Sequence, residues 1–260
     1  MLGAIVGDIV GSVHEFTRTK TKDFPLFAAD ADFTDDTVLT LAVAEWLLTG
    51  RDLVDLMHEA YAAHPLAGFG GMFNRWARLG SREPYYSFGN GSAMRVSPVG
   101  FAFDDLDDVL DWSERSAAVT HDHPEGIRGA QATAAAIWYA RRERDRDLIR
   151  VALEKQSGYD LSTPLDEIRP DYEFDVTCQG TVPQALRAFL ESTSFEDAIR
   201  NAISLGGDAD TLAAITGGVA EAYWGGVPGD IATTALARLQ PGQREVVARF
   251  QERYRGATSA

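Results

Sequence analysis

Two short stretches, far apart in the chain, carry paired aspartates and threonine hydroxyls. They are residues 33–37, Phe-Thr-Asp-Asp-Thr, and residues 206–211, Gly-Gly-Asp-Ala-Asp-Thr. Each lies where a loop enters a strongly apolar helical segment. The residues of interest are Thr34, Asp35 and Asp36, here called the first acidic cluster, and Asp208, Asp210 and Thr211, the second acidic cluster.

Together, the two clusters would place four carboxylates in one small volume. Like charges repel strongly in a partly dry site, because Coulomb energy grows as the local dielectric falls. A divalent cation relieves that repulsion, and oxygen-only ligands favour Mg²⁺, Mn²⁺ or Ca²⁺ over zinc. The leading hypothesis is a metal-dependent enzyme with a two-metal site.

Helix capping is the alternative for each cluster taken alone. Thr34 and Asp208 are good N-cap residues, and acidic residues in a first turn complement the helix dipole. One cap needs only one such residue, so the surplus carboxylates of both clusters favour ligation.

A glycine-rich segment, Phe-Gly-Asn-Gly-Ser-Ala-Met-Arg at residues 88–95, lies between the clusters. A glycine-rich turn that enters a short helix exposes backbone N–H groups to a phosphate. The segment is not a dinucleotide fingerprint, because Met94 replaces the third glycine, and Asn90 excludes a nucleophile elbow around Ser92. A simple turn is the alternative.

Other reactive side chains give weaker signals. His121 and His123 flank Asp122, but no third nitrogen or thiol ligand stands nearby, so capping of the next helix by Asp122 or His123 is favoured over zinc. His121 remains a candidate substrate contact. Cys178, the only cysteine, has no activating pattern around it and excludes an intrachain disulfide.

The elements that must position these residues are predicted to be helices throughout. We expect helices at 2–12, 38–48, 52–63, 69–79, 104–119, 125–141, 148–156, 183–190, 195–205, 211–224, 228–239 and 243–254. Gly3, Gly7 and Gly11 form one stripe of the first helix, which predicts close packing against another helix. Asp8 in that helix is either a satisfied core group or a partner of the metal site. The sequence predicts an all-α fold and a single domain, residues 1–260.

Composition limits the class of protein further. The net charge of −15 opposes stable binding to nucleic acid or to anionic membranes. The apolar N-terminus is too short to span a bilayer, and Asp8 interrupts it. We expect a monomeric, cytoplasmic protein. Residues 13–32 are predicted to be a loop, with Arg18, Lys20 and Lys22 in solvent, and residues 158–180 a long, functional irregular segment.

Five motifs in order resemble those of the ADP-ribosylglycohydrolase family. They are Gly7 and Asp8 with Glu15, residues 34–37, residues 89–95, Thr120 with His121, and residues 206–211. The resemblance runs from about Leu2 to Gly225. It implies a compact orthogonal multi-helix bundle with a central cleft that binds two Mg²⁺ or Mn²⁺ ions.

The resemblance also implies residue roles. The metal ligands would be Thr34, Asp35, Asp36, Asp208, Asp210 and Thr211. ADP-ribose would contact Gly89, Asn90, Gly91, Ser92, Met94 and His121. Glu15 and Asp36 are the candidates for proton transfer or water alignment. The implied reaction hydrolyses the glycosidic bond between ADP-ribose and a modified protein, small molecule or nucleic acid.

Two other classes of protein fit parts of this pattern. A non-catalytic ADP-ribose binder or structural, crystallin-like relative would keep the fold without the activity. A two-metal phosphohydrolase would use similar oxygen ligands but release phosphate. The complete set of ligand types, together with Glu15, favours the glycohydrolase.

Overall fold

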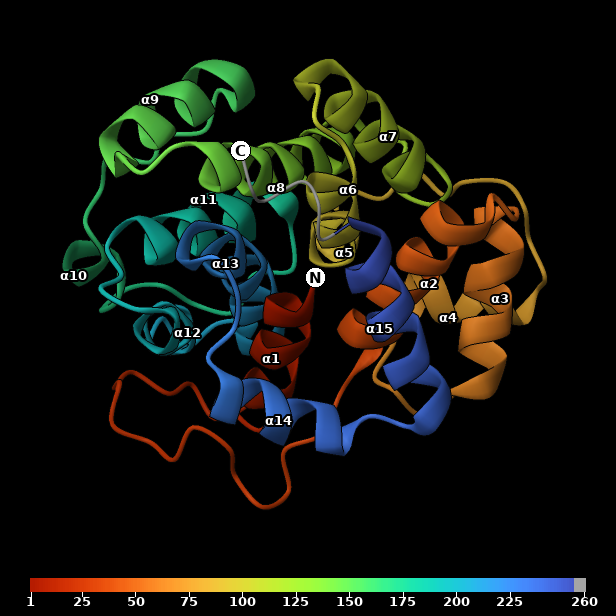
Figure 1. Ribbon diagram of the computed structural model, residues 1–260, viewed down its shortest axis with the longest axis horizontal. Helices are drawn as coiled ribbons and strands as arrows, with labels where there is room; N and C mark the ends of the chain where they lie inside the picture. Colours follow the sequence, from red (N-terminus) through yellow and green to blue (C-terminus); the bar gives the residue numbers. More distant parts are fainter. Residues whose placement is uncertain (255–260) are drawn as a thin grey trace.

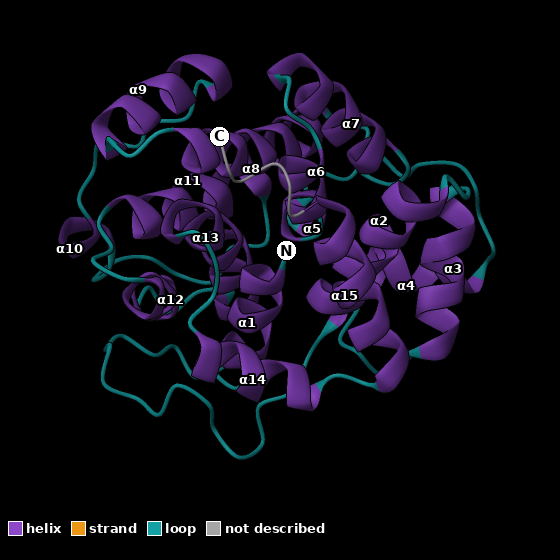
Figure 2. Cartoon of the chain, viewed as in Figure 1, coloured by secondary structure: helices purple, strands orange, loops and turns teal. Residues whose placement is uncertain are grey.

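The computed structural model describes residues 1–254, and within them it consists of helices and loops with no strand, as the sequence predicts (Figures 1 and 2). The helices are α1 (Leu2–Gly11), α2 (Asp35–Thr49), α3 (Leu53–Ala63), α4 (Gly71–Arg78), α5 (Gly91–Met94), α6 (Ser97–Ala102), α7 (Leu106–Ala118), α8 (Pro124–Arg142), α9 (Arg146–Ser157), α10 (Leu165–Ile168), α11 (Cys178–Leu190), α12 (Phe195–Ile203), α13 (Ala209–Trp224), α14 (Gly229–Arg238) and α15 (Pro241–Tyr254). In this part of the chain no helix is both long and apolar enough to cross a bilayer.

Helices α1 and α13 pack side by side and antiparallel, with their backbones almost in contact along the length of α1. A Cβ at Gly7 would lie 1.9 Å from the carbonyl oxygen of Ala213, and one at Gly3 would lie 2.1 Å from that of Gly217. At Gly11 it would lie 2.4 Å from the Cα of Asp210. The predicted glycine stripe is therefore a packing surface, and it brings the end of α1 to the second acidic cluster.

Most of the predicted helices are present, with shifts of a few residues at several ends and three larger differences. Helix α6 forms where no element was predicted, and α10 forms within the segment predicted to be irregular. Helix α11 begins at Cys178, not at Pro183, because Thr177 caps it by accepting a hydrogen bond from the Gly180 N–H at 3.1 Å. A local cap decides the start there, and Pro183 lies inside the helix.

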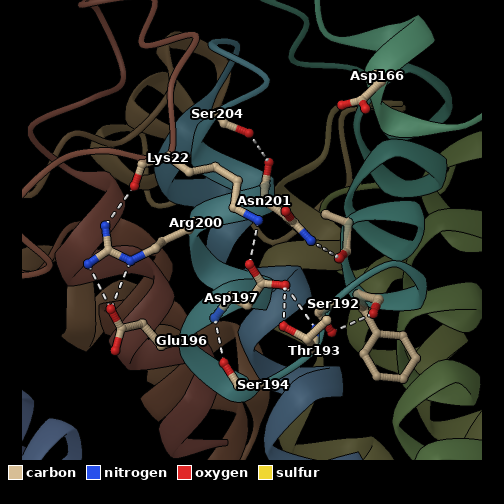
Figure 3. Close-up of polar contacts among 12 residues, drawn as sticks. Lys22, Asp166, Ser192, Thr193, Ser194, Glu196, Asp197, Arg200, Asn201 and Ser204 are labelled. Atoms are coloured by element: carbon tan, nitrogen blue, oxygen red, sulfur yellow. Dashed lines mark hydrogen bonds and ion pairs between the residues drawn. The ribbon is translucent and has the colours of Figure 1, made fainter.

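The loop between α1 and α2 runs along the outside of the molecule, and lysines fasten it (Figure 1). Lys20 Nζ donates to the carbonyls of Arg169, Tyr172 and Leu205 at 2.7, 2.5 and 2.5 Å. Lys22 pairs with Asp197 of α12 (Figure 3). The interpretation of Lys20 as purely solvated was wrong, because carbonyls at chain turns and helix ends attract its ammonium group, whereas Lys22 stays exposed and forms a surface ion pair.

The α1–α13 contact makes a stability prediction. Gly7→Ala should lower the free energy of unfolding by about 2 kcal/mol or more, because the added methyl must displace backbone atoms of α13. Urea denaturation followed by circular dichroism measures this. The matched control is Gly229→Ala, where a Cβ meets nothing within 4 Å. Equal stability of the two variants would contradict the close-packing account.

Candidate active site

A cavity of about 520 Å³ lies where the starts of α2 and α13 meet the glycine-rich loop. Its volume is in the range of small-molecule sites. All residues predicted to be catalytic, metal-binding or substrate-binding line it except Ser92: Glu15, Thr34, Asp35, Asp36, Gly89, Asn90, Gly91, Met94, His121, Asp208, Asp210 and Thr211. Tertiary packing thus brings together segments separated by most of the chain.

Asp8 fixes the first acidic cluster. Its side chain is fully buried and accepts hydrogen bonds from Thr34 and Thr37. The backbone N–H groups of Thr34 and Thr37 lie 2.9 and 3.1 Å from Oδ2, and their hydroxyls lie 2.6 Å from Oδ1 and 2.5 Å from Oδ2, respectively. Asp8 is therefore both a satisfied core group and a partner of the acidic site. Because the Thr34 hydroxyl donates to Asp8, its lone pairs stay available, one to the Asp36 N–H in the helix cap.

The second acidic cluster faces the first across the floor of the cavity. The Thr211 hydroxyl donates to Asp36 Oδ2 at 3.3 Å. Ligand oxygens of Glu15, Asp208 and Asp210 all lie within 4.8 Å of one another, which is close enough to hold one cation. The capping alternative holds for Thr34, but the Asp208 side chain caps nothing and instead accepts from the Asn90 amide at 2.7 Å.

Burial and mutual repulsion raise the pKa of every carboxyl group in the site. Burial raises the pKa of Asp35, Asp36 and Asp210 well above the usual value, and the neighbouring carboxylates add to the shift. Burial likewise raises the pKa of Asp208 to about 6 and that of Glu15 to about 7. The negative charges of Asp210 and Asp8 add to the shift of Glu15. The fold therefore holds these groups together at an electrostatic cost that bound cations would relieve.

The donor set fits divalent cations. Asp36 Oδ1 is buried without a hydrogen-bond partner in the described chain, so this carboxylate oxygen is free to bind a cation. The surrounding ligands are carboxylates and hydroxyls, with no thiol or imidazole among them, which is the chemistry of Mg²⁺ or Mn²⁺ sites.

The glycine-rich loop is held from behind by the segment before α11. The Asn90 N–H donates to Val176 O at 2.7 Å, and the Cys178 N–H donates to Phe88 O at 2.9 Å. The Cys178 thiol donates to Gly89 O at 3.0 Å, and burial raises the pKa of that thiol to about 12. Cys178 is therefore a structural, unreactive thiol.

His121 and Met94 lie against this loop, and Ser92 lies behind it. His121 Nε2 would be 3.2 Å from a Cβ at Gly91, so a side chain there would press the ring away from the loop. The Ser92 hydroxyl is fully buried and donates to Gly126 O at 2.7 Å, which gives that side chain a structural role. His123 caps α8 by accepting from the Glu125 N–H at 3.0 Å, as the capping alternative predicts.

Several lining residues were not identified from the sequence. Apolar side chains that remain exposed surround the mouth of the cavity: Met72, Tyr86, Phe88, Phe174 and Val176. The aromatic density of residues 85–88 and the length of segment 158–180 were the available signals, and the second did predict a functional segment. Gly68, Gly70 and Gly71 also line the cavity, but a loop of glycines before α4 gives no sign of where it packs.

Fold and site together define a class of all-helical proteins built around an acidic, oxygen-lined cavity. The chain belongs to the ADP-ribosylglycohydrolase family, whose model matches residues 1–258. It is 27% identical to the ADP-ribosylhydrolase ARH3 of Xenopus tropicalis and 26% identical to that of Homo sapiens; each alignment covers 86% of this chain, and 86% and 84% of the relatives. It is 26% identical to the ADP-ribosylarginine hydrolase Tri1 of Serratia proteamaculans, over 86% of this chain and 70% of that one.

Solved structures agree with this assignment. An ADP-ribosylglycohydrolase-related protein complex contains a chain that superposes with a TM-score of 0.72 and 29% identity. The match covers 98% of this chain and 97% of that one. The orthogonal helical fold predicted from the sequence is thus confirmed, and the relatives point to ADP-ribosylhydrolase activity.

The raised pKa values predict how stability depends on pH. Glu15 and Asp208 carry their full charge only above about pH 7, so the repulsion in the metal-free protein grows toward high pH, and protonation relieves it as pH falls toward the unfolded-state pKa values near 4. Asp210→Asn should therefore stabilise the metal-free protein at pH 8 by about 1 kcal/mol or more, and less at pH 5. Thermal unfolding in a chelator measures both.

The control is Asp30→Asn, which removes the same charge from an exposed position. In Mg²⁺ or Mn²⁺ the order should reverse, since the wild-type protein gains stability from binding and Asp210→Asn gains less. A wild-type melting temperature that is unaffected by either ion would contradict the metal assignment.

Proposed function

We propose that this protein hydrolyses the glycosidic bond between ADP-ribose and a modified target, with two Mg²⁺ or Mn²⁺ ions, and so reverses ADP-ribosylation. The observation that carries the proposal is the convergence of the two acidic clusters and Glu15 beside the glycine-rich loop in one cavity. The names of the relatives, ADP-ribosylhydrolase and ADP-ribosylarginine hydrolase, support the same reaction.

The two acidic clusters would hold the cations, which fix the ribose diol and supply positive charge to an attacking water. The glycine-rich loop would bind the diphosphate through backbone N–H groups. Apolar side chains at the mouth, such as Phe88 and Phe174, exclude water from the bound sugar.

Glu15 is suited to proton transfer. Cleavage of a glycosidic bond passes through an oxocarbenium-like state, and water adds at C1 while the leaving group takes up a proton. Glu15 is half-buried, and one of its carboxylate oxygens lies within 4.8 Å of those of Asp208 and Asp210, which places it where it can take a proton from a water at the acidic clusters. It would accept the proton of the water and return it to the departing nitrogen or oxygen, while Asp36 aligns that water.

The direct test is a product assay. Purified protein with Mg²⁺ or Mn²⁺ should release intact ADP-ribose from at least one of arginine-, serine- or base-linked substrates. Release should stop in a chelator and in the double variant Asp208→Ala, Asp210→Ala. Phosphate or AMP release would identify a phosphohydrolase instead, and ADP-ribose binding without any product would identify a binder.

Glu15→Gln should lower kcat about 10²- to 10⁴-fold, because the amide cannot carry the proton. Calorimetric titration with ADP-ribose should show affinity within about threefold of wild type, which separates chemistry from binding. Glu114→Gln, at an exposed glutamate outside the cavity, is the matched control. A Glu15→Gln variant with wild-type kcat would remove Glu15 from the mechanism.

A further inference from the structure

Arg95 is a buried cation without an acidic partner. Its side chain is fully buried at the end of α5, directly after the glycine-rich loop, and among residues 1–254 it is the only Lys or Arg that lines the cavity. Nη2 donates to Ser116 O at 2.9 Å and to the Thr120 hydroxyl at 2.8 Å. Nε and Nη1 have no hydrogen-bond partner among residues 1–254. Burying a guanidinium in this way is costly, so a purely structural role explains it poorly.

The Thr120 hydroxyl connects Arg95 to His121. It lies 2.7 Å from His121 Nδ1. A guanidinium only donates hydrogen bonds, so the Thr120 oxygen accepts from Arg95, and its own hydrogen can go to Nδ1 or to the Tyr85 hydroxyl, which also contacts Thr120. If Nδ1 accepts that hydrogen, the neutral ring carries its proton on Nε2.

Nε2 is the atom of His121 that faces the ligand-binding loop. It would lie 3.2 Å from a Cβ at Gly91 and 3.5 Å from one at Gly89. Burial, together with the positive charge of Arg95, lowers the pKa of His121 well below its ordinary value, so the ring is neutral at pH 7. The pKa of Arg95, lowered by burial to about 10, leaves the guanidinium charged at that pH.

We propose that Arg95 and Thr120 are positioning residues that hold His121 as the Nε2–H tautomer, so that it donates a hydrogen bond to a phosphate or ribose oxygen of the ligand. The ligand part of this inference rests on the proposed function. The opposite tautomer would present a lone pair to an oxygen acceptor, which is repulsive. Arg95 and Thr120 thus favour ligands that place an acceptor oxygen beside the glycine-rich loop.

Histidine-ring ¹⁵N NMR of the purified, ligand-free protein tests the tautomer directly, because protonated and unprotonated ring nitrogens have well-separated shifts. The His121 signals are assigned by their loss in His121→Gln. The wild-type protein should show protonated Nε2 and unprotonated Nδ1. Thr120→Val removes the hydroxyl and should increase the Nδ1–H form, whereas Thr120→Ser retains the hydroxyl and should keep the wild-type pattern.

The functional readout is ADP-ribose affinity by calorimetry. Thr120→Val should weaken it about 10-fold, as expected for one lost hydrogen bond, while Thr120→Ser should stay within about twofold of wild type. Arg95→Met should raise the pKa of His121 in an NMR titration, since a repelling charge is removed. Arg95→Met replaces a fully buried guanidinium and can prevent folding. The comparison of Thr120→Val with Thr120→Ser is therefore the decisive one.

The proposal is overturned if wild-type His121 carries its proton on Nδ1, or if Thr120→Val keeps the wild-type tautomer. If a folded Arg95→Met variant leaves the pKa of His121 unchanged, Arg95 has no part in holding the His121 tautomer. The tautomer is read without ligand, so its outcome is independent of whether ADP-ribose is released from any substrate.

Discussion

The geometry of the site depends on one buried carboxylate, Asp8. It accepts two backbone and two hydroxyl hydrogen bonds from the start of α2, and so ties the first acidic cluster to α1. The other side of α1 packs on α13 through its glycines, and α13 begins at the second acidic cluster. Helix α1 therefore fixes the separation of the two clusters, although it contributes no ligand to either.

This arrangement stores electrostatic strain. Removing five carboxyl groups from water and placing them together raises all their pKa values, and within the described part of the chain no lysine or arginine forms an ion pair with them. The rest of the fold must supply the stability that this cluster costs. A tightly packed pair of central helices, with backbones in contact, is one source of that stability.

Charged, neutral polar and aromatic residues line different parts of the cavity. Carboxylates and hydroxyls form the floor, the neutral His121 and the glycine-rich loop form one wall, and exposed aromatic side chains form the mouth. The loop that carries Glu15 contacts this mouth, because Phe16 of that loop stacks on Phe174 with ring centroids 6.2 Å apart. Lys20 fixes the same loop to three carbonyls, so Glu15 reaches the acidic floor from a restrained segment.

The sequence by itself determined the helical class, most helix positions and the two acidic clusters, whereas the roles of Glu15, Asn90 and His121 came from the family resemblance. The helices and the two clusters follow from local rules: apolar periodicity, glycine spacing, and more oxygen ligands at helix starts than capping needs. Tertiary structure decided what local rules cannot reach. It assigned Asp8 its four partners, turned Asp208 from a cap into a neighbour of Asn90, and connected Arg95 through Thr120 to His121. Each of these depends on side chains that meet across long sequence separations, where spacing carries no information about contact.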